Sequence, residues 1–197
     1  NTIKANAELF DVDSALTRND FATATNILKQ SKSIDNDNVQ KKIIKIEKQK
    51  EEYDATGFGV QQILNGKNPL IGEPIKNTTD KKILNATDNL LFNQAAKNNL
   101  NEVNTFRVVD EVFSKAGLLS PTLQETIEAG FTAGSATTFD SPTDIPDVLI
   151  QAVKTAEAAD QLGRLNLYTT DEQEIFFQNI IVSKQMLGLN DFDAIKN

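Results

Sequence analysis

Apolar residues recur at three- and four-residue steps through most of this chain, and this spacing restricts the fold more than any other feature. The clearest stripe consists of Val103, Phe106, Val109, Val112 and Phe113. Side chains at these steps line one face of an α-helix, whereas a half-buried strand needs strict alternation. No stretch alternates with period two for long enough to predict a strand. The sequence therefore predicts an all-α fold, either a multi-helix bundle or a stacked array of helical hairpins.

Short helices and one long helix are expected in the first third of the chain. An apolar stripe predicts a helix over residues 2–17, and Asp20 is placed to cap a second short helix. The two helices are expected to form an αα-hairpin. A long charged helix should start near Asp37 and either kink or restart around Gly57 and Gly59, because two glycines weaken a helix.

A proline-containing segment suggests how the chain is divided. Residues 67–79 include Pro69 and Pro74, which are not tolerated in a helix interior, and so predict a linker loop. The expected organisation is an N-terminal hairpin with the long charged helix over residues 1–66, and a C-terminal helical bundle over residues 80–197.

Helix-capping signals punctuate the C-terminal bundle. The expected helix starts are Ser120 before Pro121, Thr143 or Asp144 for a helix ending near Asp160, and two overlapping capping boxes, Thr169 with Glu172 and Thr170 with Gln173. Asp191 is expected to cap a last helix, which is too short to fold unaided. That ending, together with a start at Asn1 rather than methionine, suggests a fragment of a longer chain.

The composition argues against several kinds of site. The chain contains no cysteine and no histidine. These absences exclude disulfide frameworks, thiolate metal sites, the usual serine or cysteine hydrolases and a conventional zinc site. We therefore expect no metal-ligating, cofactor-binding or catalytic residue, and no cofactor.

The charge and hydropathy patterns bear on partners. The net charge of −8 argues against a nucleic-acid site, since phosphate binding requires clustered Lys and Arg. Residues 1–100 contain 14 basic and 13 acidic side chains, whereas residues 101–197 contain 6 and 15. No apolar stretch approaches the roughly 18–20 residues of a membrane-spanning helix, so no transmembrane segment is expected.

Carboxylates are the acid–base groups that could support catalysis. The closest clusters in the sequence are Glu51 with Glu52, Asp144 with Asp147, and Asp171, Glu172 and Glu174. Paired carboxylates could hydrolyse a glycoside across a cleft, but each of these lies at an expected helix start or on a polar helix face. Asp11, Asp13 and Asp20 lack the glycine and glutamate of a calcium-binding loop.

The order of helices and stops resembles a known class of proteins. The segments that carry the resemblance are Leu64-Asn65-Gly66 followed by Pro69-Leu70, Asn77-Thr78-Thr79-Asp80-Lys81-Lys82, Ala116-Gly117-Leu118-Leu119-Ser120-Pro121 with Leu123, a helix ending in Leu165 and Tyr168, and Met186-Leu187-Gly188-Leu189. This order resembles the helical middle regions of the large internal virion proteins of short-tailed phages, which are ejected with the genome. Some members carry a lytic transglycosylase domain, but its glutamate motif is absent here, so no catalytic residue is transferred.

The resemblance implies a non-enzymatic structural segment of a bacteriophage internal virion protein involved in DNA ejection. Such a segment would be located in the virion and would associate with copies of itself, as a homo-oligomer, or with other virion proteins, in the particle or in an envelope-spanning channel. One alternative is a cytoplasmic α-helical adaptor or repeat module that binds a protein partner. A further alternative is a peptidoglycan hydrolase that uses Glu125 or Glu172.

Overall fold

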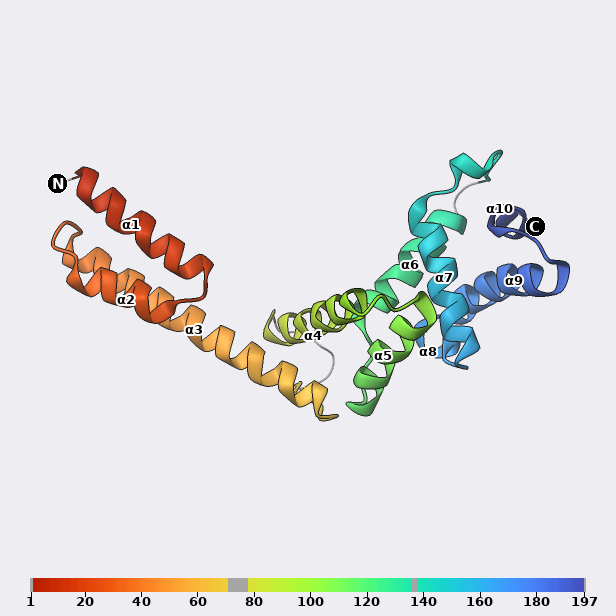
Figure 1. Ribbon diagram of the computed structural model, residues 1–197, viewed down its shortest axis with the longest axis horizontal. Helices are drawn as coiled ribbons and strands as arrows, with labels where there is room; N and C mark the ends of the chain where they lie inside the picture. Colours follow the sequence, from red (N-terminus) through yellow and green to blue (C-terminus); the bar gives the residue numbers. More distant parts are fainter. Residues whose placement is uncertain (1, 71–77, 136–137, 197) are drawn as a thin grey trace. The chain divides into compact units, whose positions relative to one another are not determined.

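The computed structural model describes residues 2–70, 78–135 and 138–196 (Figure 1). These residues form helices joined by turns and contain no strand, so the all-α prediction is confirmed. The chain divides into two compact units, Asn1–Phe58 and Gly59–Asn197, and each has its own apolar core. The expected linker over residues 67–79 lies largely outside the described residues, so the division at that segment stays a prediction.

The N-terminal unit is a helical hairpin packed on a longer helix. Helices α1 (Thr2–Thr17) and α2 (Phe21–Gln30) form the predicted hairpin, and α3 (Asn36–Leu64) follows (Figure 1). Asp20 caps α2 as predicted, because its Oδ1 accepts a hydrogen bond from the Thr23 amide at 3.0 Å. The buried core of this unit consists of Val12, Ala15, Ala24, Leu28, Val39, Ile43 and Ile46.

Helix α3 continues through its two glycines without interruption, so the predicted restart at Val60 is wrong. A glycine inside a helix costs only about 1 kcal/mol, which is too little by itself to end a helix that is buried again at Gly59 and Val60. Gly59 is itself buried, and a Cβ there would overlap the Ile83 side chain. The helix ends at the predicted place, where Gly66 adopts a φ of +70°.

The C-terminal unit surrounds one central helix. Its elements are α4 (Thr78–Lys97), α5 (Glu102–Lys115), α6 (Pro121–Ser135), the 3₁₀ turn η1 (Pro142–Asp144), α7 (Asp147–Gln161), α8 (Leu165–Tyr168), α9 (Asp171–Leu187) and α10 (Asp191–Lys196). Helix α7 packs against α5, α6, α8 and α9. Its buried face is rich in alanine, which allows close approach; a Cβ on Gly130 of α6 would overlap Ala152.

The helix predicted from Thr143 or Asp144 begins later, at Asp147. Asp144 belongs instead to the preceding 3₁₀ turn. Ile145 is extended, with φ −72° and ψ 122°, because the ring of Pro146 disfavours the helical conformation in the residue before it.

One of the two predicted capping boxes is present. The Thr170 amide donates to Gln173 Oε1 at 3.0 Å, and the Gln173 amide donates to Thr170 Oγ1 at 3.4 Å. The box between Thr169 and Glu172 is wrong, because Thr169 ends α8 and its hydroxyl donates to the Leu165 carbonyl at 2.8 Å.

The last helix, α10, has a different cap from the predicted one. Asn190 Oδ1 accepts from the Asp193 amide at 3.0 Å, so Asn190 rather than Asp191 caps this helix. Asp191 pairs with Lys184 of α9 at 2.6 Å, and Ala194 is buried. None of the helices in the described residues is both long and apolar enough to cross a membrane.

Candidate functional site

The carboxylates that the sequence singled out do not converge on one place. Glu51 and Glu52 lie on α3 in the N-terminal unit, whereas the other clusters lie at helix starts in the C-terminal unit. Asp144 Oδ2 accepts from the Ser141 amide at 2.9 Å, and Glu174 Oε1 accepts from Gln178 at 3.1 Å. Their positions therefore follow from helix capping and surface hydrogen bonding.

The aspartates compared with a calcium loop are likewise separate. Asp11 and Asp13 are exposed on α1, and Asp20 caps α2. Hydrogen bonds from Thr23 hold the pKa of Asp20 below its ordinary value. Within the described residues, no group of three or more Asp or Glu side chains is arranged to hold a metal ion.

The first carboxylate that the sequence analysis missed is Asp88, which is buried on α4. Its Oδ1 accepts from the Ser120 hydroxyl at 2.6 Å, and its Oδ2 accepts from the Thr122 amide at 2.8 Å. Ser120 Oγ in turn accepts from the Leu123 amide at 3.2 Å, which confirms Ser120 as the N-cap of α6. Asp88 therefore attaches the start of α6 to α4.

Burial raises the pKa of Asp88, because desolvation disfavours its charged form more than these hydrogen bonds favour it. The nearby charge of Glu125 acts in the same direction as burial. Both oxygens of Asp88 already accept hydrogen bonds from the start of α6, so this carboxylate links two helices.

A second network joins α5 to α8 and to the turn before it. Asp110 accepts from the Tyr168 hydroxyl at 2.8 Å and from Arg164 Nη2 at 3.1 Å. Arg164 Nε lies 3.0 Å from the other Asp110 oxygen, as an ion pair that is not aligned for a hydrogen bond. Ser114 completes the network, since it donates to Asp110 at 3.2 Å and accepts from Arg164 Nη2.

Tyr168 lies in the apolar core as well as in this network. Its ring meets Phe106 edge-on, with 5.3 Å between centroids. Burial raises the pKa of the phenol well above its ordinary value, and the hydrogen bond and negative charge of Asp110 add to this. The hydroxyl is therefore held protonated, as a donor to Asp110.

The sequence did contain a signal that Asp88 and Asp110 are buried. Asp88 follows Leu84 by four residues and precedes Leu91 by three, so it occupies a core position of its helix. Asp110 has the same relation to Phe106 and Phe113. A carboxylate on an apolar stripe needs a buried partner.

A third polar contact holds the end of the chain. Lys184 of α9 lies 2.5 Å from Glu157 of α7 and 2.6 Å from Asp191 of α10. Burial lowers the pKa of Lys184, but the hydrogen bonds to Asp191 and Glu157 outweigh burial and raise it overall. This lysine therefore fastens α10 to the bundle as a charged group.

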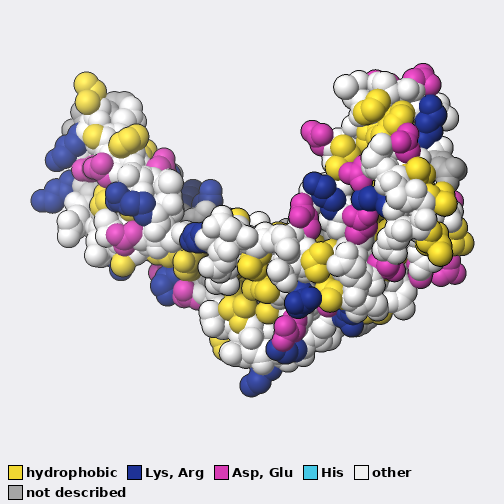
Figure 2. Space-filling model, turned by 45° about the vertical axis from the view of Figure 1, so that its right-hand side comes forward, with side chains coloured by type: hydrophobic (Ala, Val, Ile, Leu, Met, Phe, Trp, Pro, Cys, Tyr) yellow, Lys and Arg dark blue, Asp and Glu magenta, His cyan; other side chains and the backbone are white. Residues whose placement is uncertain are grey.

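Helix α9 exposes a row of apolar side chains. On the face drawn in Figure 2, hydrophobic side chains reach the surface in several groups between charged ones. On α9, Ile175, Val182 and Met186 are 62%, 49% and 79% exposed. Their spacing of seven and four residues places them on one helix face. We call this face, together with the exposed amides Gln178, Asn179 and Gln185, the α9 stripe.

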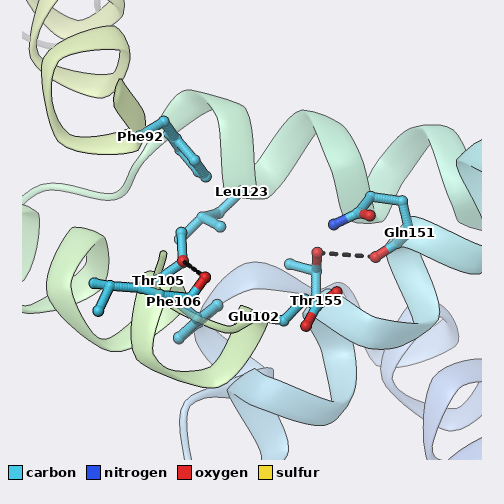
Figure 3. Close-up of a pocket in the computed structure, with 8 residues that line it drawn as sticks. Phe92, Glu102, Thr105, Phe106, Leu123, Gln151 and Thr155 are labelled. Atoms are coloured by element: carbon cyan, nitrogen blue, oxygen red, sulfur yellow. Dashed lines mark hydrogen bonds between the residues drawn. The ribbon is translucent and has the colours of Figure 1, made fainter. Parts of the chain in front are cut away.

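The C-terminal unit also contains a cavity of about 280 Å³. Figure 3 shows labelled side chains of α4, α5, α6 and α7 that line it, and Leu100 of the turn between α4 and α5 completes the lining. The apolar part is formed by Phe92, Leu100, Phe106 and Leu123, and the polar part by Glu102, Thr105, Gln151 and Thr155. Its volume suits a compact small molecule, since a dry cavity of about 150 Å³ accommodates benzene.

No family model, curated protein or solved structure matches this chain. Its functional interpretation therefore depends on its own residues and their arrangement.

Proposed function

We propose that this chain is a non-enzymatic structural segment that assembles with copies of itself, as part of an internal ejection protein of a short-tailed phage. The observation that carries the proposal is the α9 stripe. Large exposed apolar faces on a helix are common at protein–protein interfaces, because their burial in an assembly removes apolar surface from water.

The spacing of the stripe suits a helical partner. Ile175, Val182 and Met186 repeat at seven and four residues, as do the core positions of paired helices. Met186 is unbranched and adapts its shape to a facing surface. The opposite side of α9 buries Phe177, Ile180 and Ile181 in the bundle, so the helix is apolar on two faces.

The absence of charge along the stripe favours a second copy as the partner. Residues 101–197 contain 15 acidic side chains against 6 basic ones, so the charged surfaces of this half would repel the same half of a copy. Between Ile175 and Met186, the outward positions hold only apolar and amide side chains. Lys184 points away to its partners on α7 and α10. Two stripes can therefore meet without burying a charge.

A matched pair of variants tests the assembly. Ile175→Glu places a charge in the stripe, and Ile44→Glu places one on α3, where Ile44 is 64% exposed. We expect the wild-type chain and Ile44→Glu to form concentration-dependent oligomers in sedimentation experiments, and Ile175→Glu to remain monomeric. A monomeric wild-type chain, or equal behaviour of the two variants, would contradict self-association through α9.

The place of assembly needs a separate measurement. Mass spectrometry of purified virus particles should recover peptides of this chain together with capsid proteins, from a polypeptide larger than this segment. Recovery from a cellular fraction and absence from particles would contradict the virion assignment and favour a cellular helical adaptor.

A further inference from the structure

We propose that the cavity between α4, α5, α6 and α7 binds a compact organic ammonium ion, such as an arylalkylammonium. Two phenylalanine rings, two leucines and four polar side chains line the cavity, which is open to solvent on one side (Figure 3). None of the α9 stripe residues lines it, so this inference is independent of the proposed assembly.

The threonine hydroxyls can offer lone pairs to a ligand, and for Thr155 the proton is already used. Thr155 is buried, and its hydroxyl donates to the Gln151 carbonyl at 2.9 Å. The Thr105 hydroxyl donates to the Leu100 carbonyl in a long hydrogen bond of 3.5 Å. A hydroxyl whose proton is already committed can only accept from a further partner. Thr155 therefore selects a ligand that donates hydrogen bonds, and the Thr105 hydroxyl, which is held less firmly, can accept from the same ligand.

Glu102 gives the cavity its charge. It is the first residue of α5, where the helix dipole favours a negative side chain. Its ion pair with Lys154 is long, at 3.6 Å, and both side chains are about half exposed, so this pair competes weakly with a ligand. The Gln151 amide can supply a further acceptor oxygen.

The remaining walls favour an apolar body attached to the charged head. Phe106 and Leu123 are 2% and 4% exposed, and Phe92 packs against the same core. Contact with these walls would stabilise a hydrocarbon group, because its apolar surface is removed from water. The polar groups then orient the ammonium toward Glu102. A cation is further favoured by the 15 acidic side chains against 6 basic ones in residues 101–197.

Titration with three molecules of one shape tests this selectivity. Benzylammonium carries a positive charge, benzyl alcohol none and benzoate a negative charge. We expect amide chemical shifts of the full chain to follow benzylammonium binding at residues lining the cavity, with a Kd of about 1 mM. Benzyl alcohol and benzoate should bind at least about tenfold more weakly.

Variants separate charge recognition from packing. Glu102→Gln should weaken benzylammonium binding about tenfold, whereas Glu111→Gln, on the same helix but outside the cavity, should leave it unchanged. Lys154→Met should tighten binding about two- to fivefold, because it removes the competing cation. Thr155→Val keeps the shape and should weaken binding.

Three results would overturn the proposal. They are binding of benzyl alcohol or benzoate as tight as that of benzylammonium, an unchanged Kd in a folded Glu102→Gln variant, and the absence of cavity shifts with about 10 mM benzylammonium. A tighter Kd for Lys154→Met, which leaves the cavity lining intact, would support it even if Thr155→Val does not fold.

Discussion

The two units of this protein use different means to hold their helices. In the N-terminal unit, side-chain hydrogen bonds mostly join residues within one turn, such as Lys50 to Asp54 at 2.9 Å. In the C-terminal unit, buried polar side chains join residues far apart in the chain, such as Asp110 and Tyr168. The N-terminal unit adds to its apolar stripes and local caps a link from the Ser31 hydroxyl to Glu8 of α1 at 2.5 Å, whereas the larger bundle has several such links between its helices.

The C-terminal unit also has the larger apolar core. Seven buried apolar residues form the core of the N-terminal unit, whereas the C-terminal core includes buried phenylalanines and the alanine-rich face of α7. A unit of about 60 residues buries a smaller fraction of its surface and is accordingly marginal. We expect the N-terminal unit to open at lower free energy than the C-terminal unit.

The largest effect is expected from loss of the buried carboxylate on α5. Asp110→Ala leaves Arg164 and Tyr168 without their shared acceptor and should lower the free energy of unfolding of the C-terminal unit by about 3–5 kcal/mol. Chemical denaturation of the full chain measures this loss. Glu111→Ala, beside it on the exposed face, should leave the midpoint unchanged. A loss below about 1 kcal/mol for Asp110→Ala would mean that the network does not hold the bundle.

A cavity in the smaller core tests whether the units open separately. Leu28 is fully buried, and Leu28→Ala should destabilise the N-terminal unit by about 2–4 kcal/mol. Hydrogen exchange should quicken for amides of α1 and α2, and amides of α7 should keep their protection. Equal acceleration in both units would show that they unfold together.

Helices were predictable from this sequence, but the contacts between them were not. The hairpin and the capping box at Thr170 depend on residues close in sequence, so local pattern is sufficient. The same pattern failed at Gly59, where burial against Ile83 replaces the expected break. It also misplaced the start of α7, where Pro146 imposes an extended residue before it.

Candidate sites were harder to predict because they are assembled from distant segments. Asp110 and Arg164 are separated by 54 residues, and no local signal indicates which cation meets that carboxylate. The cavity is likewise lined by residues of four helices. Whether its Thr155 hydroxyl can donate to a ligand depends on the hydrogen bond that this hydroxyl already donates to the Gln151 carbonyl. The sequence indicated that a carboxylate lay on an apolar stripe, but the residue that pairs with it could be identified only from the folded structure.

Replacing a glycine by alanine is expected to change the stability in opposite directions at one position in each unit. Gly57 has open space where a Cβ would lie, so Gly57→Ala should stabilise α3 by up to about 1 kcal/mol. Gly130 lies where a Cβ would overlap Ala152, so Gly130→Ala should cost about 1–3 kcal/mol despite the better helix propensity of alanine. Thermal unfolding of both variants measures the signs. A stabilising Gly130→Ala would show that α6 and α7 can separate without cost.

The smallest effect concerns two capping aspartates whose pKa values are displaced in opposite directions. Burial raises the pKa of Asp88 in the native state, so the native state binds its proton more tightly than the unfolded state does. The contribution of Asp88 to stability is therefore fully present below its unfolded pKa, near 3.9, and decreases as pH rises through the native pKa. The stability deficit of Asp88→Asn should therefore shrink as pH rises from about 3.5 to about 7, as measured by chemical denaturation.

Asp20 provides the control of opposite sign. Its pKa is lowered by hydrogen bonds from Thr23, so its contribution is present above the unfolded pKa and is lost as pH falls through the native one. The deficit of Asp20→Asn should therefore grow as pH rises over the same interval, as measured by hydrogen exchange in α2. If both deficits change in the same direction, the capping carboxylates of the two units do not differ in burial as the structure indicates. Opposite directions would show that protonation weakens an exposed cap within its own helix and strengthens a buried cap supplied by another helix.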